Sequence, residues 1–210
     1  LFIIGMLLLV LAAAMLLPAV ADWTVGHPDW EAFAASSGIT AFAGGAMVLA
    51  NRMPAIALDR RQGFLLTALS WVVLCAFAAL PLTFSAYRLP WADAYFEAMS
   101  GLTTTGSTVL IHLESAPPGV LLWRGLLQFL GGIGIVVMAI ALLPFLRVGG
   151  MQLFKTESSD ISDKLLPQIK QIAAGIFVVY VVLNLLCAAA FWVAGMTGFE
   201  AAIHAMAAVS

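Results

Sequence analysis

Five long apolar runs constrain the fold of this sequence more than any other feature does. Because an α-helix rises about 1.5 Å per residue, about 20 apolar residues are needed to cross the roughly 30 Å hydrocarbon layer of a membrane. Runs close to or above this length cover Leu1–Ala21, Phe33–Ala50, Phe64–Ala86, Val120–Leu146 and Ile172–Ala194, and Arg124 is the one charged residue inside them. The sequence therefore predicts an all-α membrane protein, built as a multi-span helical bundle.

The composition supports a chain surrounded by lipid. Of 210 residues, 63% are hydrophobic and 10% are charged, and the mean hydropathy is +1.05. Nine Lys and Arg stand against eleven Asp and Glu, so no basic face is available to neutralise a run of phosphates, and we expect no nucleic-acid partner. Cys75 and Cys187 lie inside apolar runs, where cysteine behaves as a small hydrophobe, and they predict neither a disulfide nor a metal site.

The first apolar run has two interpretations. Ala19, Val20 and Ala21 precede Asp22 in a pattern similar to the cleavage site of a secretory signal peptide. No basic region precedes the run, however, and it is long enough to span, so a retained helix is the favoured interpretation. The chain opens inside this run without a Met and stops soon after another apolar stretch, and we expect it to be a fragment of a longer protein.

Basic residues predict the orientation, because short loops rich in Lys and Arg stay in the cytoplasm. Loop 51–62 carries three arginines, and segment 147–170 carries one arginine and three lysines. Loop 22–30 has neither residue type, and loop 87–119 has only Arg88. The alternation fits five spans and predicts a cytoplasmic N-terminus.

Between the third and fourth runs lies a segment too short to span. Residues 90–101 begin at Pro90, where a helix can start, and residues 102–109 are β-branched and interrupted by Gly106, which is typical of extended backbone. Extended backbone at membrane depth is tolerated where protein covers it or where it lines a water-filled path. We therefore predict a re-entrant pore helix followed by a loop whose carbonyl oxygens face a dehydrated monovalent cation, with Gly106 in a conformation that other residues avoid. A surface turn is the alternative.

A weak internal repeat favours the pore. Residues 93–103 can be placed over residues 200–210, and the third apolar run then falls on the fifth. In this register Ala94, Ala98 and Met99 match Ala201, Ala205 and Met206, and Thr103 matches Ser210. Repeated units of this kind are common in transporters. The predicted organisation is an N-terminal pair of spans (1–62), a complete unit of span, pore helix, filter loop and span (63–146), a cytoplasmic linker (147–170) and the start of a second unit (171–210).

Residues 93–108 resemble the first pore helix and filter of the Trk/Ktr/HKT potassium transporter family, in its bacterial TrkH/TrkG-type branch. Further similarity lies in Arg124, Gln128, residues 131–134 and residues 148–153. The family is built from four units of span, loop and span around one pore. The resemblance therefore implies potassium uptake across the bacterial inner membrane as the membrane subunit of a Trk-type system, with potassium as the transported ligand and no other cofactor.

The resemblance also implies which residues meet the ion. Thr104, Thr105, Gly106 and Ser107 would form the selectivity filter of this unit, with K⁺ at the first three, and Ser210 would begin the approach to a second filter. A homodimer and a cytosolic nucleotide-binding regulator of the TrkA kind are the implied partners, and segment 147–170 is a candidate contact for the regulator.

Four residues are candidates for supporting the filter: Thr103, Glu97, Arg124 and Gln128. Arg124 could hold the loop through Glu97 or a carbonyl oxygen, because a charge inside a membrane usually faces protein or water, or it could extend to the interface. We expect Gln128 to cross-link helices rather than to touch an ion. Glu97 could concentrate cations at the mouth or only favour the dipole of its helix.

Two other functions are alternatives to transport. In a membrane-embedded hydrolase, Ser107 would be the nucleophile and His112 its base, but five residues of extended chain separate them by about 17 Å. The chain also lacks a Gly-x-Ser-x-Gly elbow. We therefore expect no enzyme. A non-transporting membrane scaffold remains an alternative. His27, His112 and His204 are widely separated along the chain and predict no metal site.

Overall fold

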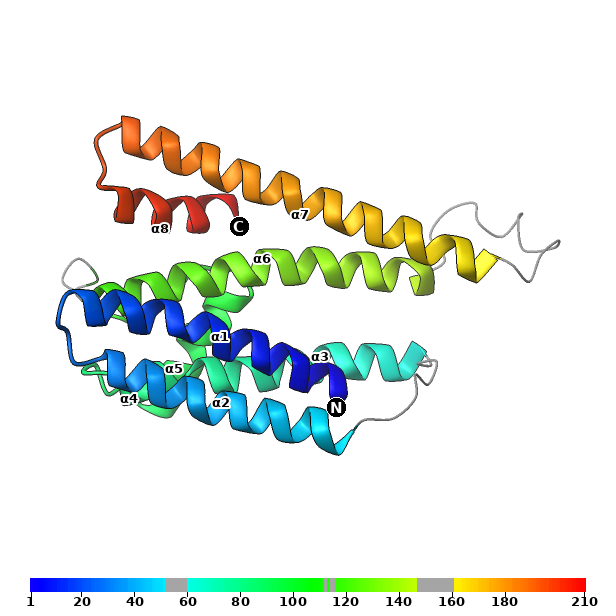
Figure 1. The fold of residues 1–210 in the computed structure, drawn as a ribbon, viewed down its shortest axis with the longest axis horizontal. Helices are drawn as coiled ribbons and strands as arrows, with labels where there is room; N and C mark the ends of the chain where they lie inside the picture. The colour runs from blue at the N-terminus through cyan, green and yellow to red at the C-terminus, as the bar shows by residue number, and fades with distance from the viewer. Residues whose placement is uncertain (52–59, 112, 114–115, 147–160) are drawn as a thin grey trace. The chain divides into compact units, whose positions relative to one another are not determined.

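A computed structural model describes residues 1–51, 60–111, 113, 116–146 and 161–210 (Figure 1). The chain divides into two compact units, one formed by Leu1–Gly131 with Ser210 and the other by Gly132–Val209. Within these described residues, five helices are long and apolar enough to cross a membrane, and each overlaps one of the predicted runs. The prediction of an all-α, multi-span membrane protein is therefore confirmed.

Helices α1 (Phe2–Thr24) and α2 (Trp30–Ala50) form an antiparallel hairpin (Figure 1). Small residues let the two backbones approach closely, because a Cβ added to Gly44 would lie 2.8 Å from the carbonyl oxygen of Gly5. The Ser37 hydroxyl donates a hydrogen bond of 2.8 Å to the carbonyl oxygen of Ala12, across the same interface. The packing of α1 against α2 agrees with a retained first span.

The third predicted span is a kinked pair of helices. Helix α3 (Arg60–Ala78) is followed by α4 (Leu80–Phe84), which has Pro81 at its start. Proline lacks the N–H that would continue the hydrogen-bond ladder of α3, so the helix bends here without ending its path through the membrane. Together the two helices form one candidate span, Arg61–Phe84.

Helix α5 (Trp91–Leu102) is short, as predicted, and Pro90 occupies the position just before its first residue. The sequence predicts extended backbone over residues 102–109. In the structure Leu102 is the last residue of α5, residues 103–104 form a turn, and residues 105–110 form neither helix nor strand. Helix α6 (Pro118–Leu146) then follows, and within the first unit Trp123 anchors it. The fully buried Trp123 indole donates a hydrogen bond of 3.0 Å to the carbonyl oxygen of Ala78, and its ring lies edge-on against Phe33.

The second unit contains α7 (Ile161–Val193) and α8 (Gly198–Val209). Helix α7 begins well before the predicted start of its apolar run, so residues 161–170 of the expected linker are helical. A search for apolar runs misses such an extension because a helix needs no apolar run outside the membrane. Thr197 and Glu200 form a capping box at the start of α8, and the hydrogen bonds from Thr197 lower the pKa of Glu200 below its usual value.

The internal repeat has a structural counterpart. The register that pairs residues 93–103 with 200–210 also pairs the first and last residues of α5 with those of α8, and both helices have 12 residues. The matched alanines are buried in both copies: Ala94 and Ala98 are 0% exposed, and Ala201 and Ala205 are 1% exposed. The weak sequence match therefore coincides with the same element and the same buried positions.

The hairpin interface gives a first prediction. Gly44→Ala places a Cβ against the backbone of α1, and we expect it to lower the free energy of unfolding by about 1–3 kcal/mol in the full-length protein. The matched control is Gly45→Ala, because no atom lies within 4 Å of a Cβ at Gly45. That control should be neutral or stabilising by up to about 1 kcal/mol, since alanine favours the helix. Unfolding in detergent micelles measures both, and equal effects would contradict the close approach.

Candidate functional site

The loop after α5 is tied to the end of that helix by its own N–H groups. The N–H of Thr105 donates to the carbonyl oxygen of Ser100 at 2.9 Å, and the N–H of Gly106 donates to the same oxygen at 3.3 Å. The backbone reverses at Thr104 (φ +56°) and again at Gly106 (φ +76°). Gly106 therefore adopts the left-handed conformation that the sequence predicts, which residues with a Cβ rarely enter.

This geometry leaves carbonyl oxygens unoccupied. In the part of the chain that the structure describes, no hydrogen bond reaches the carbonyl oxygens of Thr104, Thr105 or Gly106. Ser107 differs, because its carbonyl oxygen accepts a hydrogen bond of 2.6 Å from the Ser100 hydroxyl. The Thr103 hydroxyl is also engaged, because it lies 2.8 Å from both the Met99 carbonyl oxygen and the Thr105 hydroxyl. Backbone oxygens at positions 104–106 are thus free to accept a ligand.

Glu97 holds the far side of the loop. Its carboxylate is buried, with the residue 2% exposed, and accepts hydrogen bonds from the Thr108 hydroxyl at 3.0 and 3.1 Å and from the Val109 N–H at 3.0 Å. The Thr108 hydroxyl in turn accepts the N–H of Leu110 at 3.1 Å. One side chain of α5 therefore fixes the segment by which the loop leaves the helix.

Arg124 completes the charge balance at Glu97. Its Nε lies 2.5 Å from Oε1 of Glu97, and the Arg124 side chain is 16% exposed. Of the two possibilities open in the sequence, the structure therefore shows Arg124 turned toward the loop support rather than toward the interface. Because Arg124 belongs to α6, the ion pair links α5, the loop and α6.

Two glycines allow α6 to approach closely enough for this contact. A Cβ at Gly131 would overlap the carbonyl oxygen of Leu102, and a Cβ at Gly101 would lie 2.9 Å from Cβ of Leu127. Gln128 lies one turn of α6 beyond Arg124, and its Nε2 would be 3.5 Å from a Cβ at Gly106. The sequence predicts that Gln128 supports the filter by cross-linking helices rather than by touching an ion, and in the structure its amide lies beside the loop at Gly106.

Two further residues were considered in the sequence. Ser210 is the exposed residue that follows α8, and it is grouped with the first compact unit. His112, the base considered for a hydrolase, lies outside the described residues.

Comparison with known proteins identifies the family. Residues 31–210 match TrkH, described as a cation transport protein. The chain belongs to the TrkH family of cation transporters. It is 45% identical over 209 residues to the Trk system potassium uptake protein TrkI of Halomonas elongata, covering 99% of this chain and 42% of that protein. It is 38% identical over 211 residues to the Trk system potassium uptake protein TrkH of Escherichia coli K12, covering 99% of this chain and 44% of that protein.

A solved structure has the same fold. The crystal structure of the potassium transporter TrkH from Vibrio parahaemolyticus superposes with a TM-score of 0.84 at 34% identity, over 97% of this chain and 41% of that one. The chain thus spans less than half the length of these TrkH-family relatives. The family match and the five candidate spans among the described residues make the chain part of a multi-pass membrane protein.

The ion pair of this TrkH-family loop gives a second prediction. Arg124→Met leaves the Glu97 carboxylate buried without its cation, and we expect a loss of about 3–5 kcal/mol in the free energy of unfolding. Adding Glu97→Gln removes the orphaned charge, so the double variant should be less destabilised than the sum of the two single variants. Asp93→Asn is the matched control, because Asp93 lies on the same helix and should contribute about 0.3–1 kcal/mol through the helix dipole. Additive single and double effects would show that the pair is not coupled.

Proposed function

We propose that the full-length protein containing this chain takes up potassium ions across the bacterial inner membrane through a filter-lined pore, and that this chain supplies the first filter loop. The observation that carries the proposal is the set of unoccupied carbonyl oxygens at Thr104, Thr105 and Gly106. The relatives named above, which are Trk system potassium uptake proteins, support the choice of ion.

The chemistry of the loop suits a dehydrated monovalent cation. Each carbonyl oxygen can replace part of the hydration shell of the ion. Ser107 is the last residue of the filter, and its carbonyl oxygen accepts a hydrogen bond from the Ser100 hydroxyl. The loop follows the C-terminal end of α5, where the helix dipole presents partial negative charge. The Arg124 charge would repel a cation if it were unpaired, but Glu97 neutralises it at 2.5 Å. We assign Glu97, Arg124, Thr103 and Gln128 to positioning the loop.

The remaining organisation follows from the same proposal. Residues 1–62 form an extra N-terminal pair of spans, and residues 63–146 form the first unit, in which α5 is the re-entrant pore helix. Residues 147–170 link it on the cytoplasmic side to a second unit beginning at 171, with α8 as its pore helix and Ser210 at the approach to the second filter. The basic residues of the loops favour a cytoplasmic N-terminus.

The partners are proposed from the family resemblance alone. They are a second copy of the protein, forming a homodimer, and a cytosolic nucleotide-binding regulator of the TrkA kind, with segment 147–170 as its contact.

The filter gives a third prediction. Gly106→Ser forces a Cβ into the left-handed conformation, so the carbonyl oxygens should lose their alignment. We expect the preference for K⁺ over Na⁺ to fall about tenfold, equivalent to about 1.4 kcal/mol. The readout is rubidium uptake and potassium-dependent growth of a bacterium that lacks its own potassium importers, with a cognate regulator supplied.

Gly38→Ser is the matched control, because Gly38 lies on α2 with no atom within 4 Å of an added Cβ. It should rescue growth as well as the unchanged protein does. If the unchanged protein reaches the membrane and restores no uptake, the non-transporting scaffold is favoured instead.

A further inference from the structure

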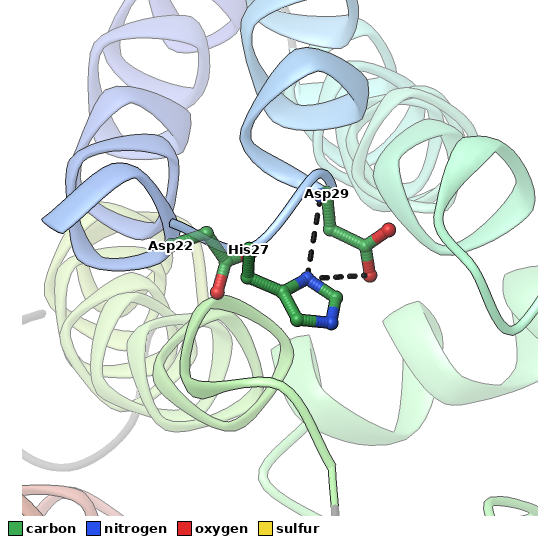
Figure 2. Close-up of side chains that lie close together, drawn as sticks. All are labelled: Asp22, His27 and Asp29. Carbon is green, nitrogen blue, oxygen red and sulfur yellow. Dashed lines mark hydrogen bonds and ion pairs between the residues drawn. The ribbon is translucent and has the colours of Figure 1, made fainter. Parts of the chain in front are cut away.

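A second polar group lies at the end of the α1–α2 hairpin, away from the filter loop. Asp22 belongs to the last turn of α1, and His27 and Asp29 belong to the connection that leads into α2. Their candidate ligand atoms, one carboxylate oxygen from each aspartate and one ring nitrogen of His27, all lie within 4.8 Å of one another. Figure 2 shows the three side chains gathered beside this loop.

Each aspartate uses only one of its two carboxylate oxygens. Oδ1 of Asp22 accepts the N–H of Gly119 at 2.6 Å, and Oδ1 of Asp29 accepts the N–H of Ala86 at 2.8 Å. The two Oδ2 atoms are buried and have no hydrogen-bond partner. Asp22 is 0% exposed and Asp29 is 5% exposed, so water does not readily replace the missing partner. A buried carboxylate oxygen without a partner is costly, which indicates that something else occupies this position.

Neighbouring side chains supply little positive charge. His27 Nδ1 lies 3.8 Å from Oδ2 of Asp29 and also accepts the N–H of Asp29 at 3.3 Å, as a neutral ring nitrogen does. Within the described ranges, no lysine or arginine forms an ion pair with either aspartate. The His27 side chain is 33% exposed, which leaves a route from solvent to the two carboxylates.

We propose that Asp22, His27 and Asp29 bind a divalent transition-metal cation such as Zn²⁺. One imidazole nitrogen and two carboxylate oxygens form a donor set that these ions accept, with further positions left to water. Bonds of about 2.0–2.2 Å set the ligand atoms of a tetrahedral site roughly 3.3–3.6 Å apart. Candidate atoms separated by as much as 4.8 Å must therefore approach one another by about 1 Å, through rotation of the partly exposed His27 ring and movement of the two carboxylates. The bound ion satisfies both unpaired oxygens and offsets their charge.

The site would join separate parts of the first unit. Asp22 holds the first turn of α6 through Gly119, and Asp29 holds Ala86, the second residue after the end of α4. A Cβ at Gly119 would overlap the Asp22 carboxylate, so the backbone of α6 is packed directly against the site. A metal ion would therefore fix the α1–α2 connection to the beginning of α6 and the end of α4.

The test is metal binding to the tag-free, full-length protein in detergent, which does not depend on transport. Zn²⁺ added to metal-free protein should raise the melting temperature by about 3 °C, with saturation. Co²⁺ should give a visible absorption band that Zn²⁺ removes.

Both signals should be lost in His27→Ala and in Asp29→Asn, the second of which keeps an oxygen for the Ala86 N–H. They should persist in Glu31→Gln, which changes an exposed carboxylate two residues away, and in His204→Ala, which changes a histidine on α8. No saturable response in the unchanged protein, or an equal response in all four variants, would overturn the proposal and leave the three side chains as a hydrogen-bonded cluster.

Discussion

The hydrogen bonds to the buried carboxylate of Glu97 hold the loop after α5 in position. Residues 105–110 have no helical or sheet ladder to hold their backbone, so their position depends on contacts from outside the segment. Glu97 supplies these contacts at Thr108 and Val109 and is itself held by Arg124. A carboxylate with several donors and a cation can remain ionised away from water, and it can then order a backbone that would otherwise be free.

Close helix packing makes this arrangement possible. Gly101 on α5 and Gly131 on α6 remove the side chains that would keep the two helices apart, which brings Arg124 to Glu97 and Gln128 to Gly106. Membrane helices gain little from burying apolar surface against one another, so small residues and polar contacts determine where they meet. The same device joins α1 to α2 at Gly5 and Gly44. The position of the loop is therefore a consequence of packing throughout the first unit.

Local sequence patterns predicted most of the fold. Hydropathy located the five spans because lipid imposes a length and an apolar surface on any helix that crosses it. Pro90 and the shortness of the following segment located α5, and Gly106 marked the left-handed position in its loop. The sequence also suggested Glu97 as a partner of Arg124, because a charged side chain inside a membrane span usually faces protein or water.

Other features, above all contacts between residues far apart in the sequence, could not be predicted from the sequence. The early start of α7 was missed because residues 161–170 are not apolar. The grouping of His27 with Asp22 and Asp29 could not be predicted, because the spacing of these residues does not show that both carboxylates turn toward the His27 ring. The hydrogen bond from Gly119 to Asp22, which fixes one of those carboxylates, joins residues 97 positions apart and has no signature in the sequence.

We propose that the carbonyl oxygens of the Glu97-supported loop bind the transported ion. Anomalous diffraction from crystals of the full-length protein grown with rubidium is the test. We expect a rubidium peak coordinated by the carbonyl oxygens of Thr104, Thr105 and Gly106. Rubidium bound elsewhere in the protein, with this loop ordered and empty, would contradict it.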